Sequence, residues 1–298
     1  MVLVSIIALL LLDRLVEAKT DWRTRHAPEV IFRRWLELAY RGLPAWLARG
    51  LLWLLPAAIV AVIDYFAASW WDWLFAVAVL MLVVAPRHSQ RINFELDQGC
   101  LAEDTELVSQ ARRVLFADSR YRPDAINARI TGQRLVLLGY SEWFALLFWF
   151  VLLGPAGAVF YRSTEWLARL NLTDEPRRGW IKRCQQFTLG VLSVPASLVF
   201  AVLLMLAGSF QNSLQHWRFD RYLGFRHGAR SWLEAYTLGL LARVGHSAIE
   251  TEHKDIALDR QAGLSEQRFW YRAANAVQLR AQWFGLGLLA LLLIAGWL

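Results

Sequence analysis

Lysine is almost absent from this sequence. Only Lys19, Lys182 and Lys254 are lysines among 32 basic residues, so nearly all of the positive charge is carried by arginine. No lysine follows a glycine, which excludes a Walker A loop, because that phosphate-binding loop ends in Gly-Lys. Arginine and the sixteen tryptophans are residue types that anchor at lipid headgroups, although biased codon usage gives the same arginine count without any function.

Cysteine is scarce, and the features of a signal peptide are missing. Cys100 and Cys184 are the only cysteines, and both lie beside arginine-rich segments that we expect in the cytoplasm, so no disulfide framework is predicted. The apolar stretch 1–12 has no positively charged start and no small-residue cleavage site, and Asp13-Arg14 follows it. We interpret it either as a short helix whose end reaches the headgroups or as a half-buried anchor.

The sequence has too few polar residues for an ordinary soluble domain. Hydrophobic residues make up 57% of the 298 residues, and the mean hydropathy is +0.32, which is typical of a membrane protein. The net charge of +7 therefore indicates contact with anionic lipid. Residues 216–236 interleave four arginines with aromatic side chains, as in some RNA-binding segments, but a membrane-surface helix explains them better. No nucleic-acid partner is predicted.

The hydrophobic runs predict an all-α, polytopic integral membrane protein of one domain, with broken or re-entrant helices and cytoplasmic amphipathic helices. Basic residues flank the pair of runs 50–67 and 70–85 on both outer sides and are absent between them, which favours a transmembrane hairpin with cytoplasmic flanks. The predicted segments are an N-terminal apolar anchor and basic surface helix (1–49), the transmembrane hairpin (50–86), a cytoplasmic helical insert (87–138), a broken-helix core (139–208), a basic amphipathic region (209–280) and a C-terminal transmembrane helix (281–298).

The stretch 139–162 is the centre of the predicted core. Between Trp143 and Tyr161 there is no charged side chain, and this length is about that of a membrane-crossing helix. The Gly-Pro-x-Gly sequence at 154–157 interrupts its second half. Proline frees a backbone carbonyl, so a break of this kind inside a bilayer persists only where protein or water covers the exposed backbone.

The distribution of arginine favours two broken segments, 143–161 and 187–207, the second with Pro195 in its middle. If both segments are broken or re-entrant, every basic segment of the chain stays on the cytoplasmic side. If both cross completely, the basic residues of 162–187 lie outside, against the positive-inside rule. Because that rule is statistical, a complete 143–161 span remains open.

Polar residues at the two ends of the interrupted run are the candidate ligand-binding residues Ser141, Glu142 and Arg162. A re-entrant path brings the two ends close together. Glu142 then orients or charge-pairs a ligand, Ser141 donates a hydrogen bond, and Arg162 holds an anionic group with two parallel hydrogen bonds. In the alternative interpretation, Glu142 and Arg162 mark the two membrane interfaces.

One histidine pattern has the spacing of a metal site. His246, Glu250 and His253 fall at i, i+4 and i+7 and share one face of a helix. Three polar residues on the solvated face of an amphipathic helix explain the same spacing, because short motifs of this kind often mislead. No metal site is therefore predicted.

Several short sequence words carry a resemblance to a known family. They are Leu-Leu-Asp-Arg at 11–14, Ser141-Glu142, the Phe-Trp-Phe run, Leu-Gly-Pro-x-Gly at 153–157, Tyr161-Arg162 and Val194-Pro195-Ala196. On the words from Ser141 onward, residues 124–210 resemble the family that joins the inner-membrane protein AmpE to the cobalamin-pathway amide synthases called CbiB or CobD. The Leu-Leu-Asp-Arg word at 11–14 and the apolar C-terminal tail resemble AmpE proteins too. The synthase branch implies binding of ATP, a corrinoid and an amino-alcohol. The AmpE branch implies an inner-membrane signalling accessory linked to cell-wall recycling and β-lactamase induction.

Departures from the synthase words favour the AmpE branch. The synthases carry an Asn-Thr-Leu-Asp word after their Tyr-Arg, whereas Glu165-Trp166-Leu167-Ala168 stands here. They also carry an acidic pair before a Pro-Ala-Arg word, where this chain has Thr188-Leu189 and Pro195-Ala196-Ser197. Phosphate chemistry needs cations or metal-bound carboxylates near the charge, so the missing carboxylates and arginine speak against catalysis.

The resulting prediction is a regulatory or ligand-sensing protein of the AmpE type in the bacterial inner membrane. The missing synthase words speak against an enzyme, and the question of catalytic activity stays open. The predicted protein crosses that membrane several times, with its basic loops in the cytoplasm, and needs no cofactor. Its partners are anionic lipid and a cell-wall-recycling protein. The alternatives are a CbiB/CobD-like ATP-dependent amide synthase of cobamide biosynthesis, for which ATP and magnesium are implied, and a membrane scaffold for a cell-wall enzyme.

Overall fold

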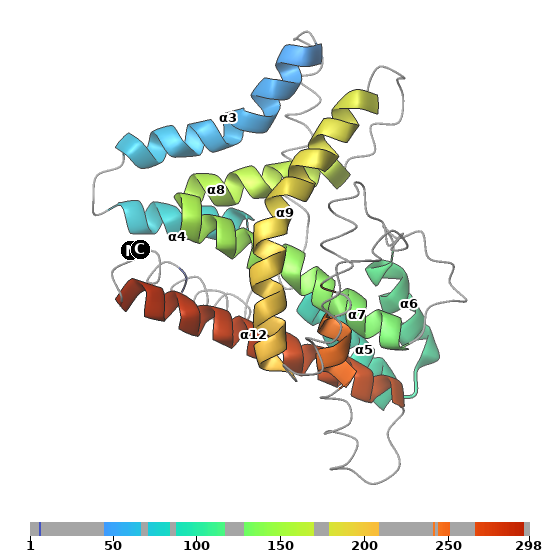
Figure 1. Ribbon diagram of the computed structural model, residues 1–298. Helices are drawn as coiled ribbons and strands as arrows, with labels where there is room; N and C mark the ends of the chain where they lie inside the picture. Colours follow the sequence, from blue (N-terminus) through green and yellow to red (C-terminus); the bar gives the residue numbers. More distant parts are fainter. Residues whose placement is uncertain are drawn as a thin grey trace, which may run out of the picture. The chain divides into compact units, whose positions relative to one another are not determined.

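A computed structural model shows that the described part of the chain is built from helices (Figure 1). It describes residues 6, 45–66, 71–83, 88–116, 128–169, 179–208, 241, 244–250 and 266–294. The prediction of an all-α fold is thereby confirmed for these residues. The chain divides into two compact units, one formed by Met1–Pro86 and Ala145–Gln185 and the other by Arg87–Phe144 and Gln186–Leu298. The predicted single membrane domain and its segment boundaries stay predictions.

The first unit is built around α8 (Ala145–Arg169). Helices α3 (Ala45–Phe66) and α4 (Asp72–Val83) include most of the two apolar runs of the predicted hairpin, 50–67 and 70–85. Both helices pack against α8. Large apolar side chains on α3 are exposed, among them Leu54 and Val62. Exposed large apolar side chains on one helix are typical of contact with lipid or with another protein.

Helix α8 is interrupted at Gly154, as the sequence predicts. Gly154 has φ 68° and ψ −162°, a backbone conformation that is essentially restricted to glycine, and Pro155 follows it. A Cβ atom added at Gly157 would lie 2.5 Å from the carbonyl oxygen of Trp149. Eight residues of a straight helix rise about 12 Å, so this proximity requires the second arm of α8 to turn back on the first (Figure 1).

The second unit contains α5 (His88–Leu101), α6 (Thr105–Leu115), α7 (Ala128–Gly139) and the long α12 (Glu266–Ile294). Helix α12 packs on α7 and α5, and α5 packs on α6. Asp104 caps α6, because its carboxylate accepts hydrogen bonds from the backbone N–H groups of Glu106 and Leu107. Gly99 permits the close approach of α5 and α6, since a Cβ atom there would lie 2.7 Å from Val108.

A short π-helix, η3 (Tyr140–Phe144), follows α7 and packs on α9 (Gly179–Ala207). The rings of Tyr140, Phe144 and Phe200 form an aromatic cluster with centroids 4.8 to 6.4 Å apart. The Tyr140 hydroxyl donates a 2.9 Å hydrogen bond to the carbonyl oxygen of Ser193. Aromatic pairs of this geometry stabilise a core beyond their buried area, so η3 has a fixed position on α9.

The prediction of a second broken segment at 187–207 is wrong. Helix α9 is continuous through this range, with Pro195 inside it. The missing N–H of Pro195 removes one hydrogen bond to Val191, but no glycine with positive φ stands beside Pro195 to turn the chain. Gly154 supplies that conformation in α8, which is why only the Gly-Pro sequence breaks its helix.

Among the described residues, the segments Ile130–Trp166 and Phe187–Ala207 are long and apolar enough to cross a membrane. The first of these includes the interruption at Gly154. Shorter apolar helical segments lie at Leu54–Tyr65 and Leu74–Val83. Helix α12 runs without interruption through the predicted boundary between 280 and 281, and its end at Ile294 covers most of the predicted C-terminal span. Most of the predicted N-terminal segment 1–49 lies outside the described residues.

Candidate functional site

A buried ion pair lies on the second arm of α8. The guanidinium Nη1 of Arg162 donates a 2.6 Å hydrogen bond to the Glu165 carboxylate, and the two side chains are 7% and 5% exposed. The pair forms locally because residues at i and i+3 lie on one helix face. The Trp166 ring lies 5.3 Å from the Arg162 guanidinium carbon, within range of a cation–π interaction.

Arg162 retains hydrogen-bonding capacity beyond this pair. Its Nε is buried and has no hydrogen-bond partner within the described part of the chain. A buried donor without an acceptor costs free energy, and in native proteins such a group often has a functional role. The Nε edge of the Arg162 guanidinium could therefore donate a hydrogen bond to an anionic oxygen, while Nη1 of the same group is bound to Glu165.

The whole helical turn around this pair is buried. Tyr161, Ser163 and Thr164 are buried together with Arg162 and Glu165, and the Thr164 hydroxyl donates a 2.8 Å hydrogen bond to the Phe160 carbonyl oxygen. Helix-borne hydroxyls commonly make such bonds to the preceding turn. The turn combines a cation, a carboxylate and hydroxyl groups away from solvent, a composition typical of a binding site and unusual for a packed apolar core.

Ser141 and Glu142 lie in η3, in the other compact unit. The Ser141 hydroxyl donates a 3.1 Å hydrogen bond to the Leu138 carbonyl oxygen, and the Glu142 side chain is buried. Arg162 belongs to the first unit, so the predicted site of Ser141, Glu142 and Arg162 stays a prediction. What the structure adds to it is Glu165, whose spacing from Arg162 was visible in the sequence.

The π-helical turn is itself a polar feature of the second unit. Trp143 is buried, and its indole N–H finds no acceptor in the described residues. π-Helical turns occur frequently at functional sites because the inserted residue changes the direction of neighbouring side chains. Glu142 and Trp143 are adjacent in this turn, so a buried carboxylate and a buried donor lie side by side in the sequence of η3.

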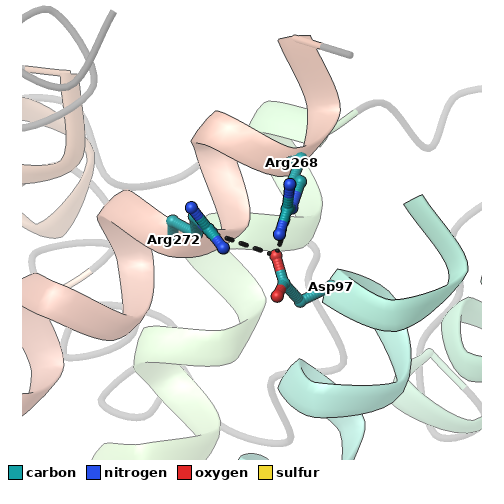
Figure 2. Close-up of polar contacts among 3 residues, drawn as sticks. All are labelled: Asp97, Arg268 and Arg272. Atoms are coloured by element: carbon teal, nitrogen blue, oxygen red, sulfur yellow. Dashed lines mark hydrogen bonds and ion pairs between the residues drawn. The ribbon is translucent and has the colours of Figure 1, made fainter. Parts of the chain in front are cut away.

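A second charged cluster joins α5 to α12 (Figure 2). Asp97 Oδ1 accepts a 2.8 Å hydrogen bond from Arg268 Nε and a 3.2 Å hydrogen bond from Arg272 Nε. Arg268 is 6% exposed, Asp97 25% and Arg272 34%. Arg268 and Arg272 lie at i and i+4 on one face of α12, so a single carboxylate neutralises part of both charges.

Burial raises the pKa of the Asp97 carboxyl, but the hydrogen bonds and charges of Arg268 and Arg272 outweigh this effect. The net pKa lies below the ordinary value of 3.8. A lowered folded-state pKa means that Asp97 contributes stability above the unfolded pKa, and that this contribution is lost as the pH falls through the folded pKa.

We therefore expect Asp97→Asn to lower the free energy of unfolding by about 2 kcal/mol at neutral pH. The asparagine leaves two arginines facing each other without a counter-charge. Thermal unfolding of both proteins across a pH series is the measurement. The difference should begin to shrink as the pH falls below the unfolded-state pKa of about 4, and it is lost as the pH passes the lower folded-state pKa, where wild-type Asp97 becomes protonated. A difference that is constant from neutral to acidic pH would contradict a role for the ionised carboxylate.

Arg112 on α6 lies against the same end of α12. Its Nη2 donates to the Tyr271 hydroxyl at 2.6 Å and to Gln267 Oε1 at 3.0 Å, and its Nε lies 3.2 Å from the same hydroxyl. Burial raises the pKa of Tyr271 above 10.0 more than the nearby Arg112 lowers it, so the phenol is neutral at physiological pH. Both partners of Arg112 are therefore uncharged.

The predicted absence of a metal site is not tested by the histidines. His246 Nε2 lies 3.7 Å from a Glu250 oxygen, and its ring stacks on Trp270 at 6.0 Å. His253, the third residue of the pattern, lies outside the described residues. Within the described ranges no group of three or more His, Cys, Asp or Glu side chains gathers at metal-binding distance.

Comparison with known proteins relates the chain to one cobalamin-pathway protein. It is 31% identical over 175 residues to the cobalamin biosynthesis protein CobD of Chromobacterium violaceum. The match covers 53% of this chain and 54% of CobD, so the chain spans about half the length of the curated relative it matches. No protein-family model matches the chain, and no solved structure matches it.

This similarity supports the relationship to CbiB and CobD proteins that the sequence words indicate. The AmpE-type role in signalling and β-lactamase induction receives no support from the comparisons. Of the two branches, the predicted alternative is therefore the better supported.

Proposed function

We propose that this chain is a membrane protein of cobamide biosynthesis of the CbiB/CobD type, with ATP-dependent amide synthesis as its activity. The observation that carries the proposal is the 31% identity to CobD over 175 residues. The missing synthase words favour a regulatory AmpE-type protein, but the buried carboxylate of Glu165 beside Arg162 weakens the argument against catalysis.

The missing carboxylate of the synthase word has a candidate replacement. The synthase Asp corresponds to Ala168 here, and Glu165 precedes that position by three residues. Residues at i and i+3 share a helix face, so Glu165 presents a carboxylate on the same face, one turn earlier. Its 2.6 Å contact with Arg162 orients the guanidinium of the Tyr161-Arg162 word, which is one of the words that carry the resemblance.

Amide synthesis from a carboxylate and an amine requires activation of the acid, which ATP supplies as a substrate. In this proposal Arg162 binds an anionic oxygen of the acid or of the phosphate, and its charge favours the negatively charged transition state. Glu165 fixes the guanidinium and keeps it from rotating away. The described residues gather no carboxylate cluster that fits magnesium, so no step is assigned to a metal ion.

Location in the bacterial inner membrane is part of the proposal. Two long apolar helical segments and the similarity to CobD support it. Exposed apolar side chains on α12, including Trp283, Phe284 and Leu291, favour lipid contact of that helix.

We expect the full chain to restore cobamide-dependent growth to a bacterium that lacks its own CobD when the corrinoid acid precursor is supplied. The purified protein in detergent should also gain thermal stability with ATP and magnesium, because a ligand that binds only the folded state raises the melting temperature. The two measurements are independent, so poor expression in the host does not decide the outcome. Absence of both growth and an ATP-dependent shift would sink the proposed activity.

A further inference from the structure

We propose that α8 is a re-entrant hairpin, which enters the lipid bilayer from the cytoplasmic side, turns among the acyl chains and returns to the same side. The partner of its exposed apolar tip is therefore lipid. This inference rests on the membrane location in the proposed function, but it does not depend on the proposed activity. It assigns both ends of α8 and the Arg162–Glu165 pair to one face of the membrane.

The direction of the chain reverses inside α8. Gly154 has a positive φ of 68°, and Pro155 after it lacks the N–H that would continue the hydrogen-bond ladder. A Cβ atom at Gly157 would lie 2.5 Å from the carbonyl oxygen of Trp149, so the second arm starts beside the first arm and does not extend it. A helix that turns back in this way has both ends on one side of the layer that holds its tip.

The apolar parts of both arms are too short to cross a bilayer. The charge-free stretch before the break, 143–153, rises about 16 Å as a helix, whereas the hydrocarbon core is about 30 Å thick. After the break, the charge-free stretch 155–161 rises about 10 Å before Arg162. Each apolar part therefore reaches only to about the middle of the bilayer.

The tip between the arms is apolar and exposed. Leu152 and Leu153, the last residues before the break, are 53% and 57% exposed. The sequence Leu-Leu-Gly-Pro-Ala-Gly at 152–157 contains no polar side chain. A turn that emerges into water usually carries polar residues, whereas exposed leucines at a turn favour contact with acyl chains. Pro155 and Gly157 are buried, as expected where protein covers an interrupted backbone inside a membrane.

Basic residues on both sides of the hairpin indicate the cytoplasmic face. They are frequent in 87–134 and again in 162–183, and none occurs in 143–161. Cytoplasmic segments of membrane proteins carry such an excess of arginine and lysine. Arg162 follows Gly154 by about two helical turns, or about 12 Å, which brings it back close to the cytoplasmic headgroups. The anionic ligand proposed for Arg162 therefore arrives from the cytoplasm.

The test places single cysteines in the full chain, with Cys100 and Cys184 replaced by serine. Membrane vesicles of known orientation are then treated with a maleimide that cannot pass through lipid. Gln133→Cys precedes the charge-free run and Arg169→Cys follows it, and we expect both to react only from the cytoplasmic side. Tyr65→Cys is the control, because Tyr65 is 83% exposed at the end of α3 and should react only from the outer side.

Leu153→Cys tests the depth of the tip. A fluorophore attached there in nanodiscs should be quenched more by lipids that carry a quencher near the end of the acyl chain than by lipids that carry it near the headgroup. The maleimide should not reach this cysteine from either side. The same fluorophore at Tyr65→Cys should show the opposite order of quenching.

Reaction of Gln133→Cys and Arg169→Cys from opposite sides would overturn the inference in favour of a straight crossing. Reaction of Leu153→Cys from the outer side would also overturn it, because the tip would then pass through the bilayer. Both failures leave the proposed function intact if the protein stays in the membrane fraction after alkaline washing. Release of the protein by that wash would instead overturn the membrane location itself.

Discussion

Gly157→Ala should lower the free energy of unfolding by about 2 to 3 kcal/mol, the range for forcing an extra group into a packed site. The new Cβ atom would lie 2.5 Å from the Trp149 carbonyl oxygen and 2.5 Å from Leu153 Cβ. The carbonyl belongs to the backbone of the other arm of α8, so it moves only if the two arms separate. Urea or thermal unfolding of the purified protein in detergent measures the effect.

Gly154→Ala tests the effect of backbone strain at the same turn without the effect of a steric clash. No atom lies within 4 Å of the added Cβ, but φ of +68° is unfavourable for an L-residue. The expected cost is about 1 to 3 kcal/mol from strain alone. Gly287→Ala on α12 is the matched control, because its Cβ position is open and its φ is not positive. Alanine is the better helix former, so this control should gain about 0.5 to 1 kcal/mol.

The three variants therefore predict an order of stability, with Gly287→Ala above the wild type and both α8 variants below it. Equal stabilities of Gly157→Ala and the wild type would show that the arms of α8 are not in contact. In that case the turn at Gly154 would be an open kink, and the conclusion that the second arm of α8 packs on the first would be wrong.

The turn in α8 was predictable because its cause is local. Glycine followed by proline combines a residue that accepts positive φ with one that cannot continue the hydrogen-bond ladder. Pro195 led to the wrong prediction of a break in 187–207. A helix accommodates an isolated proline when the residues on both sides keep helical dihedrals. The flanking glycine, not the proline, decided the outcome.

The contacts of the charged clusters were not predictable in the same way. Asp97 and Arg268 are 171 residues apart in the chain, and no spacing rule connects them. Arg112 and Tyr271 are 159 residues apart. Glu165 is different, because its i, i+3 spacing from Arg162 is visible in the sequence and predicts a contact on one helix face. The comparison with the synthase word Asn-Thr-Leu-Asp drew attention only to the missing aspartate. Burial of the pair, which gives it chemical interest, depends on tertiary packing that the spacing of the two residues does not reveal.

Arg162→Met should abolish rescue of cobamide-dependent growth and destabilise the protein. Removing one partner of a buried ion pair takes away the counter-charge of the other, at a cost of about 3 to 5 kcal/mol. Glu165→Met should be destabilising for the same reason. These single variants therefore do not distinguish a residue that binds substrate from one that only holds the helix, and unfolding must be measured beside growth.

The double variant Arg162→Met/Glu165→Met makes that distinction. Replacing a buried ion pair with apolar residues of similar volume is often neutral or stabilising, so the double variant should recover most of the stability lost by either single variant. It should still fail to support growth, because the guanidinium edge that we propose binds an anionic oxygen is gone. An ATP-dependent rise in melting temperature, if present in the wild type, should be reduced in the double variant as well.

Arg91→Met/Glu95→Met is the matched control on α5. This pair lies at i and i+4, but its side chains are 63% and 31% exposed, so its loss should cost less than about 1 kcal/mol and leave growth unchanged. If the buried double variant is stable and also supports growth at the wild-type rate, the Arg162–Glu165 pair has no part in binding substrate. A stable protein without growth instead assigns the lost function to the guanidinium and carboxylate themselves, because packing and fold are then preserved.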